Sequence, residues 1–357
     1  MHSSDSSCSI GTAQGLTPGH IYKFRHKVTN IVGDSEYSDV LSVGLVDAPS
    51  AVTNLAKVDS LSTTTQIALQ WDLTADSNSP AGVIRGYRVY MVDPSISEDE
   101  TLVYDGYGFS KTNYATISGL TTGNEYRFTV AAIDFNGEGT KSTELSIHAC
   151  TSPSGVPRPQ RVSSTSSQIV IKWDNVTSTG GCPITGYAVY RDAGDKSDAT
   201  TEVNTASDPA VRDNPSLHEL TVTNFPSSME GESFRFRIQA FNVEGSAYSE
   251  TASFVLAGVP QAPSVDPIEE TDETTSSQVA LRLTSMTSLA ETGGSPILLY
   301  EVAMKSDGVW NVIQNSTSIH VTVTDNIEEG KVYGFKYRAY NVIGKGSYSG
   351  VTYVTAA

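Results

Sequence analysis

The sequence predicts an all-β chain of tandem, seven-stranded antiparallel β-sandwiches. Three observations predict it: short segments of alternating apolar and polar residues, recurrence of these segments about every 100 residues, and a composition rich in turn-forming residues. Of the 357 residues only 38% are hydrophobic and 18% are charged, whereas 29 are Gly and 15 are Pro. Alternation with period two buries one face of a strand. No stretch has a convincing helical period, so we expect little helix.

The clearest repeat is a strand pattern that occurs four times. Aromatic or apolar residues at alternate positions are followed by Asn or Asp and then by Gly, in segments that begin at Tyr22, Tyr126, Phe234 and Tyr333. Each segment should form a strand with one buried face. Each should end in a tight turn, because Asn, Asp and Gly favour turn conformations. The four copies predict four structural units.

Two further strand patterns lie upstream of that repeat, but only in the last three units. One ends in Trp71, Trp173 or Leu283, and the other carries Tyr87, Tyr187 or Tyr300. A unit of about 100 residues with several short alternating strands has the size of a seven-stranded sandwich. The first unit lacks these strands and should be incomplete.

These residues resemble tandem fibronectin type III domains, which have an immunoglobulin-like fold. The family places a Trp on strand B, a Tyr on strand C and a Leu-x5-Tyr corner before strand F. The corner matches Leu16 with Tyr22, Leu120 with Tyr126, and Ile327 with Tyr333. The resemblance implies that the corner hydroxyl bonds to upstream backbone. Leu283 in place of Trp predicts that the core of the fourth unit is smaller at that point. Phe234, nine residues after Phe225, predicts a corner without a hydroxyl and with an insertion.

Prolines before each expected first strand set the domain boundaries. We expect a partial domain at 1–47 that holds only C-terminal strands, and complete domains at 48–153, 154–258 and 259–357. We also expect Met1 to lie inside a domain of a longer polypeptide. The alternative is that a partner chain completes the first unit by strand addition. The short linkers predict a rod with limited bending.

Two of the three cysteines form a candidate pair. Cys150 ends the last strand of the second unit, and Cys182 lies in the B–C loop of the third, which the resemblance places at the pole nearest the preceding domain. The fourth unit has Ser295 in place of Cys182, and the strand before it has no Cys, so the pair is present or absent together. One interpretation is a Cys150–Cys182 disulfide between domains; the other is two separate small hydrophobic residues. Cys8 remains, either free or paired outside this sequence.

Two sequons, at Asn175 and Asn315, could carry glycans if the chain is secreted. An acidic stretch from Asp266 to Glu273 could be imagined as a calcium site. We interpret it as a solvated edge, because no known calcium loop occurs in it.

Charge and motifs exclude several classes of function. The net charge of −17 argues against nucleic acid and anionic membrane partners. No apolar run is long enough to insert in a membrane. The six histidines show no paired ligand spacing, and no P-loop, G-x-S-x-G or G-x-G-x-x-G motif occurs. We therefore expect no enzymatic activity, no cofactor and no metal site.

The resemblance implies a non-catalytic structural or adhesion module of a large extracellular or cell-surface protein. Such a module would act as a semi-rigid spacer, or as a filament or matrix component, that binds other proteins or further copies of the same chain. Two alternatives stay open. One is an intracellular cytoskeletal scaffold built of fibronectin type III repeats, and the other is an accessory segment of a larger extracellular enzyme or receptor.

Overall fold

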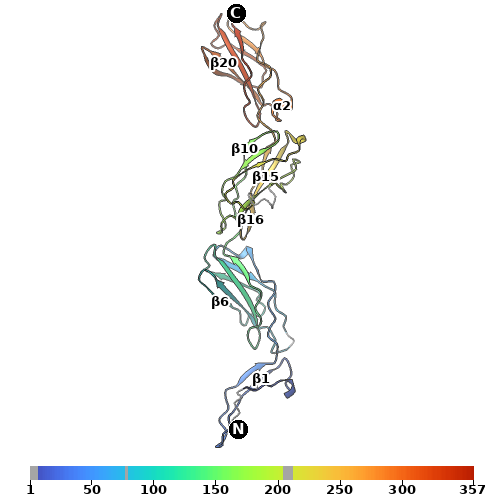
Figure 1. Cartoon of the computed structure of the whole chain (residues 1–357), viewed down its shortest axis with the longest axis vertical. Coiled ribbons are helices and arrows are strands. Elements are labelled where there is room, and N and C mark those ends of the chain that lie inside the picture. Colours follow the sequence, from blue (N-terminus) through green and yellow to red (C-terminus); the bar gives the residue numbers. More distant parts are fainter. Residues whose placement is uncertain (1–6, 77–78, 204–211) are drawn as a thin grey trace. The chain divides into compact units, whose positions relative to one another are not determined.

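Antiparallel strands joined by short turns make up the architecture in the computed structural model, which describes residues 7–76, 79–203 and 212–357. Figure 1 shows these strands as arrows, coloured along the sequence. The chain divides into two units, and each is described by itself. The first unit consists of Met1–Ser152, Ser178–Pro183 and Asn242–Gly245. The second consists of Pro153–Thr177, Ile184–Phe241 and Ser246–Ala357. The prediction of an all-β chain is confirmed.

The second sandwich lies in the first unit and has seven strands in two sheets. The smaller sheet has the order β3-β4-β7, with β3 at Ala56–Lys57, β4 at Gln66–Gln70 and β7 at Tyr114–Ser118. The larger sheet has the order β6-β5-β8-β9, with β6 at Ser97–Asp105, β5 at Gly86–Asp93, β8 at Glu125–Ile133 and β9 at Leu145–His148. The 3-10 helix η2 (Asp59–Leu61) joins the first two strands.

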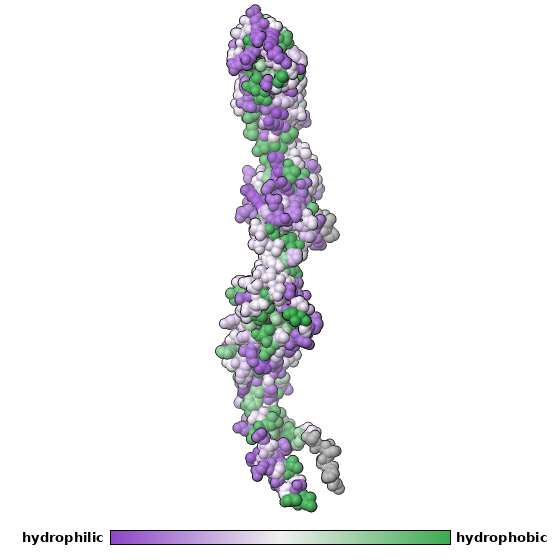
Figure 2. All heavy atoms as spheres, turned by 90° about the vertical axis from the view of Figure 1, so that its left-hand side faces the viewer, coloured by the Kyte–Doolittle hydropathy of each residue, from purple (hydrophilic) through white to green (hydrophobic). Residues whose placement is uncertain are grey.

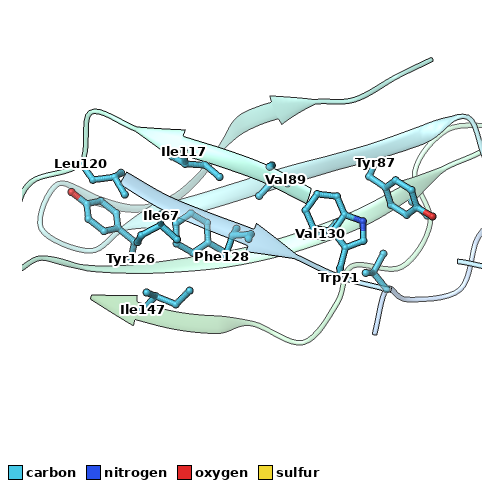
Figure 3. Close-up of a cluster of buried hydrophobic side chains, with 14 of the residues drawn as sticks. Ile67, Trp71, Tyr87, Val89, Ile117, Leu120, Tyr126, Phe128, Val130 and Ile147 are labelled. Atoms are coloured by element: carbon cyan, nitrogen blue, oxygen red, sulfur yellow. The ribbon is translucent and has the colours of Figure 1, made fainter. Parts of the chain in front are cut away.

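The core of this sandwich consists of the inward residues of both sheets (Figure 3). Trp71 and Tyr87 pack at one end with ring centroids 5.7 Å apart, and Leu120 and Tyr126 lie at the other end. All four are buried. Burying a large apolar side chain contributes about 1.5–3 kcal/mol, so this alternating set stabilises the two-sheet arrangement.

The third sandwich repeats this topology, and most of it lies in the second unit. Its smaller sheet has the order β10-β11-β14, at Gln160–Ser164, Ile169–Lys172 and Glu219–Val222. Its larger sheet contains β13 (Thr201–Glu202), β12 (Gly186–Arg191) and β15 (Ser233–Asn242), with β16 (Gly245–Tyr248) and β17 (Ala252–Val255) both beside β15. The last strand is therefore split in two. Two of its loops, Ser178–Pro183 and Asn242–Gly245, belong to the first unit.

The fourth sandwich also has seven strands. Its sheets have the orders β18-β19-β22, at Ile268–Glu269, Val279–Arg282 and His320–Val323, and β21-β20-β23-β24, at Val309–Ser316, Leu299–Ser306, Val332–Tyr340 and Thr352–Thr355. The helix α2 (Leu289–Thr292) begins with a capping box, in which Ser288 accepts the Glu291 amide and the Glu291 carboxylate accepts the Ser288 amide. This turn was not expected from the sequence.

The core of the fourth sandwich differs from the others around Leu283. Leu283 is indeed buried where the other sandwiches have Trp, but Tyr337 on β23 is also fully buried. The Tyr337 ring lies 5.9 Å from that of Tyr300, and its hydroxyl contacts the Thr284 backbone next to Leu283. Tyr337 on the larger sheet therefore adds a buried ring near the position where Leu283 replaces Trp.

The first unit begins with a two-stranded sheet rather than a sandwich. The 3-10 helix η1 (Thr12–Gln14) precedes β1 (Ile21–Phe24), which pairs with β2 (Leu41–Gly44). Leu41 and Val43 on β2 are exposed because no second sheet covers them in the described part of the chain. The alternating pattern that begins at Tyr22 continues past the end of β1 at Phe24.

The predicted tyrosine corners are confirmed. The Tyr126 hydroxyl accepts the Thr121 amide at 2.8 Å, and the Tyr333 hydroxyl accepts the Glu328 amide at 2.8 Å. The Tyr22 hydroxyl accepts the Thr17 amide at 2.6 Å.

The third corner lacks this hydroxyl, as the sequence predicted, and an arginine takes its place. The 3-10 helix η3 (Ser227–Met229) forms within the predicted insertion. The Arg191 guanidinium packs over the rings of Phe225 and Phe234, at 4.9 and 5.3 Å, and donates to the Asn224 carbonyl. Tyr333 donates to the corresponding Asn326 carbonyl, and both asparagines have φ near +60°.

Candidate functional site: the disulfide-linked joint

A disulfide joins Cys150 and Cys182, whose Cα atoms are 5.8 Å apart. Cys150 follows β9, and Cys182 lies in the loop Ser178–Pro183 between β11 and β12. Both cysteines are buried, at 0% and 2% exposure. We call this loop, the turn Asn242–Gly245 and the residues around Cys150 the joint; all of them belong to the first unit.

Glycine permits the close approach of the two backbones at the joint. Gly180 has φ of +73°, and a Cβ on it would collide with the Thr151 carbonyl. The Thr151 amide donates to the Gly180 carbonyl at 2.9 Å. The sequence placed turn residues here, but it did not indicate this backbone contact.

The turn asparagine of the repeat holds the joint together. The Asn242 amide nitrogen donates to the carbonyls of Thr151 and Thr179, at 2.7 and 2.8 Å. Its side-chain oxygen accepts the amides of Glu244 and Gly245. One side chain thus shapes its own turn and binds the linker and the disulfide loop. Sequence reasoning assigned this Asn to a turn only.

A nearly buried ion pair lies beside the disulfide. Lys57 Nζ is 2.7 Å from Glu244 Oε2 and donates to the Cys150 carbonyl at 3.0 Å. Glu244 also accepts the His148 amide at 2.8 Å. The side chains of Lys57 and Glu244 are only 11% and 13% exposed, so removing one partner would leave the other charge poorly solvated.

The same asparagine contact recurs in the second unit without a disulfide. The Asn341 amide nitrogen donates to the carbonyls of Gly258 and Thr292, at 2.7 and 2.8 Å. The Gly258 amide donates to the Gly293 carbonyl at 2.7 Å, as Thr151 does to Gly180. The backbone and asparagine contacts therefore occur at the linkers before both the third and the fourth sandwich. The joint differs by its Cys150–Cys182 disulfide.

The second sandwich has Asp134 where the third and fourth have this Asn. Asp134 Oδ1 accepts the amides of Asn136 and Gly137, but buried Oδ2 has no hydrogen-bond partner among the described residues. Asn136 makes the linker contact instead. Its side-chain oxygen accepts the Gly44 amide and its side-chain nitrogen donates to the Gly44 carbonyl, both at 2.8 Å.

Cations and aromatic rings alternate on the outer faces of the larger sheets. Arg237 lies between Tyr190 and Tyr248, and Lys336 lies between Trp310 and Tyr348. Such contacts stabilise by about 0.5–1 kcal/mol each at exposed sites. These faces therefore combine aromatic and cationic groups, a composition that suits protein contacts.

The most strongly perturbed acid of these faces is Glu301 on β20, which is 3% exposed. Burial alone would raise its pKa, but hydrogen bonds from Tyr340, Tyr348 and Arg338 outweigh burial and lower the pKa to about 2. Burial and the bond to Glu301 raise the pKa of Tyr348 to about 12. The carboxylate is therefore a structural anion.

The remaining candidate residues lie apart. Asn175 is exposed in the loop after β11, where its side-chain oxygen lies 2.9 Å from His218 Nε2. Asn315 is exposed on β21, one residue before the strand ends. Cys8 is exposed with a free thiol. Within the described ranges no group of three or more His, Cys, Asp or Glu side chains is placed to hold a metal ion.

Hydrophilic residues cover much of the visible surface of both units, and exposed apolar residues gather in small groups among them (Figure 2). Among the described residues there is no helix both long enough and apolar enough to cross a bilayer.

The profile of the fibronectin type III domain matches residues 50–148, which contain the second sandwich. Residues 50–148 thus match the fibronectin type III family, and the chain is similar to proteins named for this domain. Mouse fibronectin type-III domain-containing protein 3A is 28% identical over 96% of the chain and 27% of its own length. Rat neogenin is 27% identical over 66% of the chain and 16% of its own length.

Exoglucanase B of Cellulomonas fimi is 27% identical over 51% of this chain and 17% of its own length. The chain thus spans about a quarter or less of the relatives it matches, and one of them is named as an enzyme.

Proposed function

We propose that this chain is a non-catalytic structural or adhesion module of an extracellular or cell-surface protein. It acts as a semi-rigid spacer that binds other proteins, or further copies of the same chain, through sheet faces and loops. The buried Cys150–Cys182 disulfide carries the proposal, because disulfides persist mainly in oxidising compartments. The asparagine contacts that tie linkers to loops support the semi-rigid part.

We further propose the four domains 1–47, 48–153, 154–258 and 259–357. Each boundary falls between the last strand of one sheet pair and the first strand of the next: after β2, after β9 and after β17. The linkers there are short, and each of the last three domains has its own hydrophobic core.

Asn175 and Asn315 are the proposed glycan positions. Both side chains are exposed, which glycosylation of a folded chain requires. A bulky polar sugar on β21 would also shield that edge strand from pairing with other chains.

The test is a mass measurement on the parent protein purified from its own cells without reductant. We expect a peptide pair linked through Cys150 and Cys182, and glycans on Asn175 or Asn315 that are lost in Asn→Gln variants. Surface biotinylation of intact cells should label the protein. Unmodified asparagines together with three free thiols would overturn the proposal and favour the intracellular scaffold.

An accessory segment of a larger extracellular enzyme is the second candidate, and the match to exoglucanase B favours it. The two proposals differ in one observable. Sequencing the complete transcript would reveal a catalytic domain on the same polypeptide in the second case.

A further inference from the structure

The disulfide closes a ring that contains the first two strands of the third sandwich. Cys150 follows β9 and Cys182 precedes β12, with a sequence separation of 32. The strands β10 and β11 lie between them. Two covalent routes therefore lead from β9 to β12: one directly across the disulfide and one through the intervening polypeptide.

The two routes differ greatly in length. Across the disulfide the Cα atoms are 5.8 Å apart, whereas the intervening polypeptide, fully extended, would span about 110 Å. When the chain is pulled at its ends, tension runs through the shorter route. The longer route stays slack as long as the bond is intact.

We propose that the disulfide takes β10 and β11 out of the load path, so that tension enters the third sandwich at its B–C loop and β12. The bond then limits how far the chain extends when that sandwich unfolds. This inference deepens the proposed role as a spacer and rests on it.

The surroundings of the disulfide protect the bond while the fold persists. The thiol positions are buried, and Asn242 together with the Thr151–Gly180 hydrogen bond holds the loop against the linker. The Lys57–Glu244 pair lies beside Cys150. A thiol reductant must reach a sulfur atom to attack it, so reduction should be slow until the joint opens.

The fourth sandwich supplies a control within the same molecule. Its first strands, β18 and β19, follow a linker that is held by Asn341 and by the Gly258–Gly293 hydrogen bond, with no covalent bond. The position that corresponds to Cys182 is Ser295. The full length of the fourth sandwich should therefore extend on unfolding.

The experiment is single-molecule force extension of the full chain, attached at its two termini, without reductant. We expect one unfolding event that is shorter by about 110 Å than the same event in the double variant Cys150→Ser/Cys182→Ser. The events of the second and fourth sandwiches should be equal in both proteins. If every unfolding event has the same length in the wild-type chain and in the double variant, the proposal is overturned.

A second measurement needs no variant. The wild-type chain is held at constant force after all sandwiches have unfolded, and a dithiol reductant is added. The reductant closes to its cyclic disulfide as the protein disulfide becomes two thiols, and we expect one further step of about 110 Å. Absence of this step would overturn the load-path proposal. Free thiols in the protein from its native cells would instead overturn the extracellular function, so the two failures are distinguishable.

Discussion

Single residues show how the repeats tolerate the loss of a family residue. Leu283 replaces a core Trp, and Tyr337 on the opposite sheet fills the space. Phe234 lacks the corner hydroxyl, and Arg191 supplies a hydrogen bond to the corner carbonyl instead. In each case a side chain distant in sequence restores the contact. A core at close-packed density leaves no room for an uncompensated void.

Glu301 gives a residue-scale prediction. Its pKa is lowered from 4.5 to about 2 in the folded state, so its contribution to stability is complete above pH 4.5 and is lost as the pH falls towards 2. We expect Glu301→Gln to destabilise the fourth sandwich at pH 7 by roughly 1.5–3 kcal/mol, the range for hydrogen bonds to a charged group. Between pH 4.5 and 2 the stability of the variant should also fall much less than that of the wild type.

The measurement is urea unfolding followed by fluorine NMR of fluorotryptophan. The protein has three Trp residues, and Trp71, Trp173 and Trp310 lie in the second, third and fourth sandwiches. Each sandwich therefore has its own signal. Glu329→Gln, at an exposed carboxylate, is the matched control. Equal acid sensitivity of wild type and Glu301→Gln would contradict the assignment.

At the scale of elements, the turn after the long strand of the larger sheet decides how each sandwich meets its linker. Asn242 and Asn341 each donate to two carbonyls. Asp134 has no hydrogen to donate when ionised, and its buried Oδ2 has no partner in the described structure. The element keeps its shape, because the aspartate still accepts the two turn amides.

A reciprocal exchange tests this turn. Asp134→Asn should stabilise the second sandwich by about 1 kcal/mol, because a neutral amide costs less to bury without a partner than a carboxylate does. Asn341→Asp should destabilise the fourth by about 1–3 kcal/mol, because two donors become an oxygen facing two carbonyls. The midpoints of the Trp71 and Trp310 signals in urea report the two changes. If both substitutions shift their urea midpoints in the same direction, the proposed role of the turn is contradicted.

At the scale of the whole molecule, one fold is repeated while the connections between copies differ. The linker before the third sandwich is covalently braced, and the linker before the fourth is held by hydrogen bonds alone. A net charge of −17 favours solubility of such a repeat chain.

The disulfide gives a prediction at this scale. Closing a ring across a separation of 32 residues should stabilise the chain by about 3–4 kcal/mol, through restriction of the unfolded state. We expect Cys150→Ser/Cys182→Ser to lower the urea midpoint of the Trp173 signal most, because the ring encloses strands of the third sandwich. Cys8→Ser, at an exposed thiol, should change nothing. A uniform shift of all three Trp signals would contradict a local effect.

The sequence by itself determined the strands, the repeat, the tyrosine corners and the two candidate cysteines, because alternation, turn residues and spacing are local properties of a chain. It left the disulfide as one of two interpretations. It gave no sign of the packing of Tyr337 and Arg191, the carbonyl partners of Asn242 or the Lys57–Glu244 pair.

Only the tertiary structure decided those contacts. Lys57 and Glu244 are 187 residues apart, and Asn242 binds a carbonyl 91 residues away. Such partners are brought together by strand pairing and loop packing across sandwiches, and no local pattern records them. The replacement of Trp by Leu283 is likewise visible in the sequence, but the buried Tyr337 near it depends on the facing sheet.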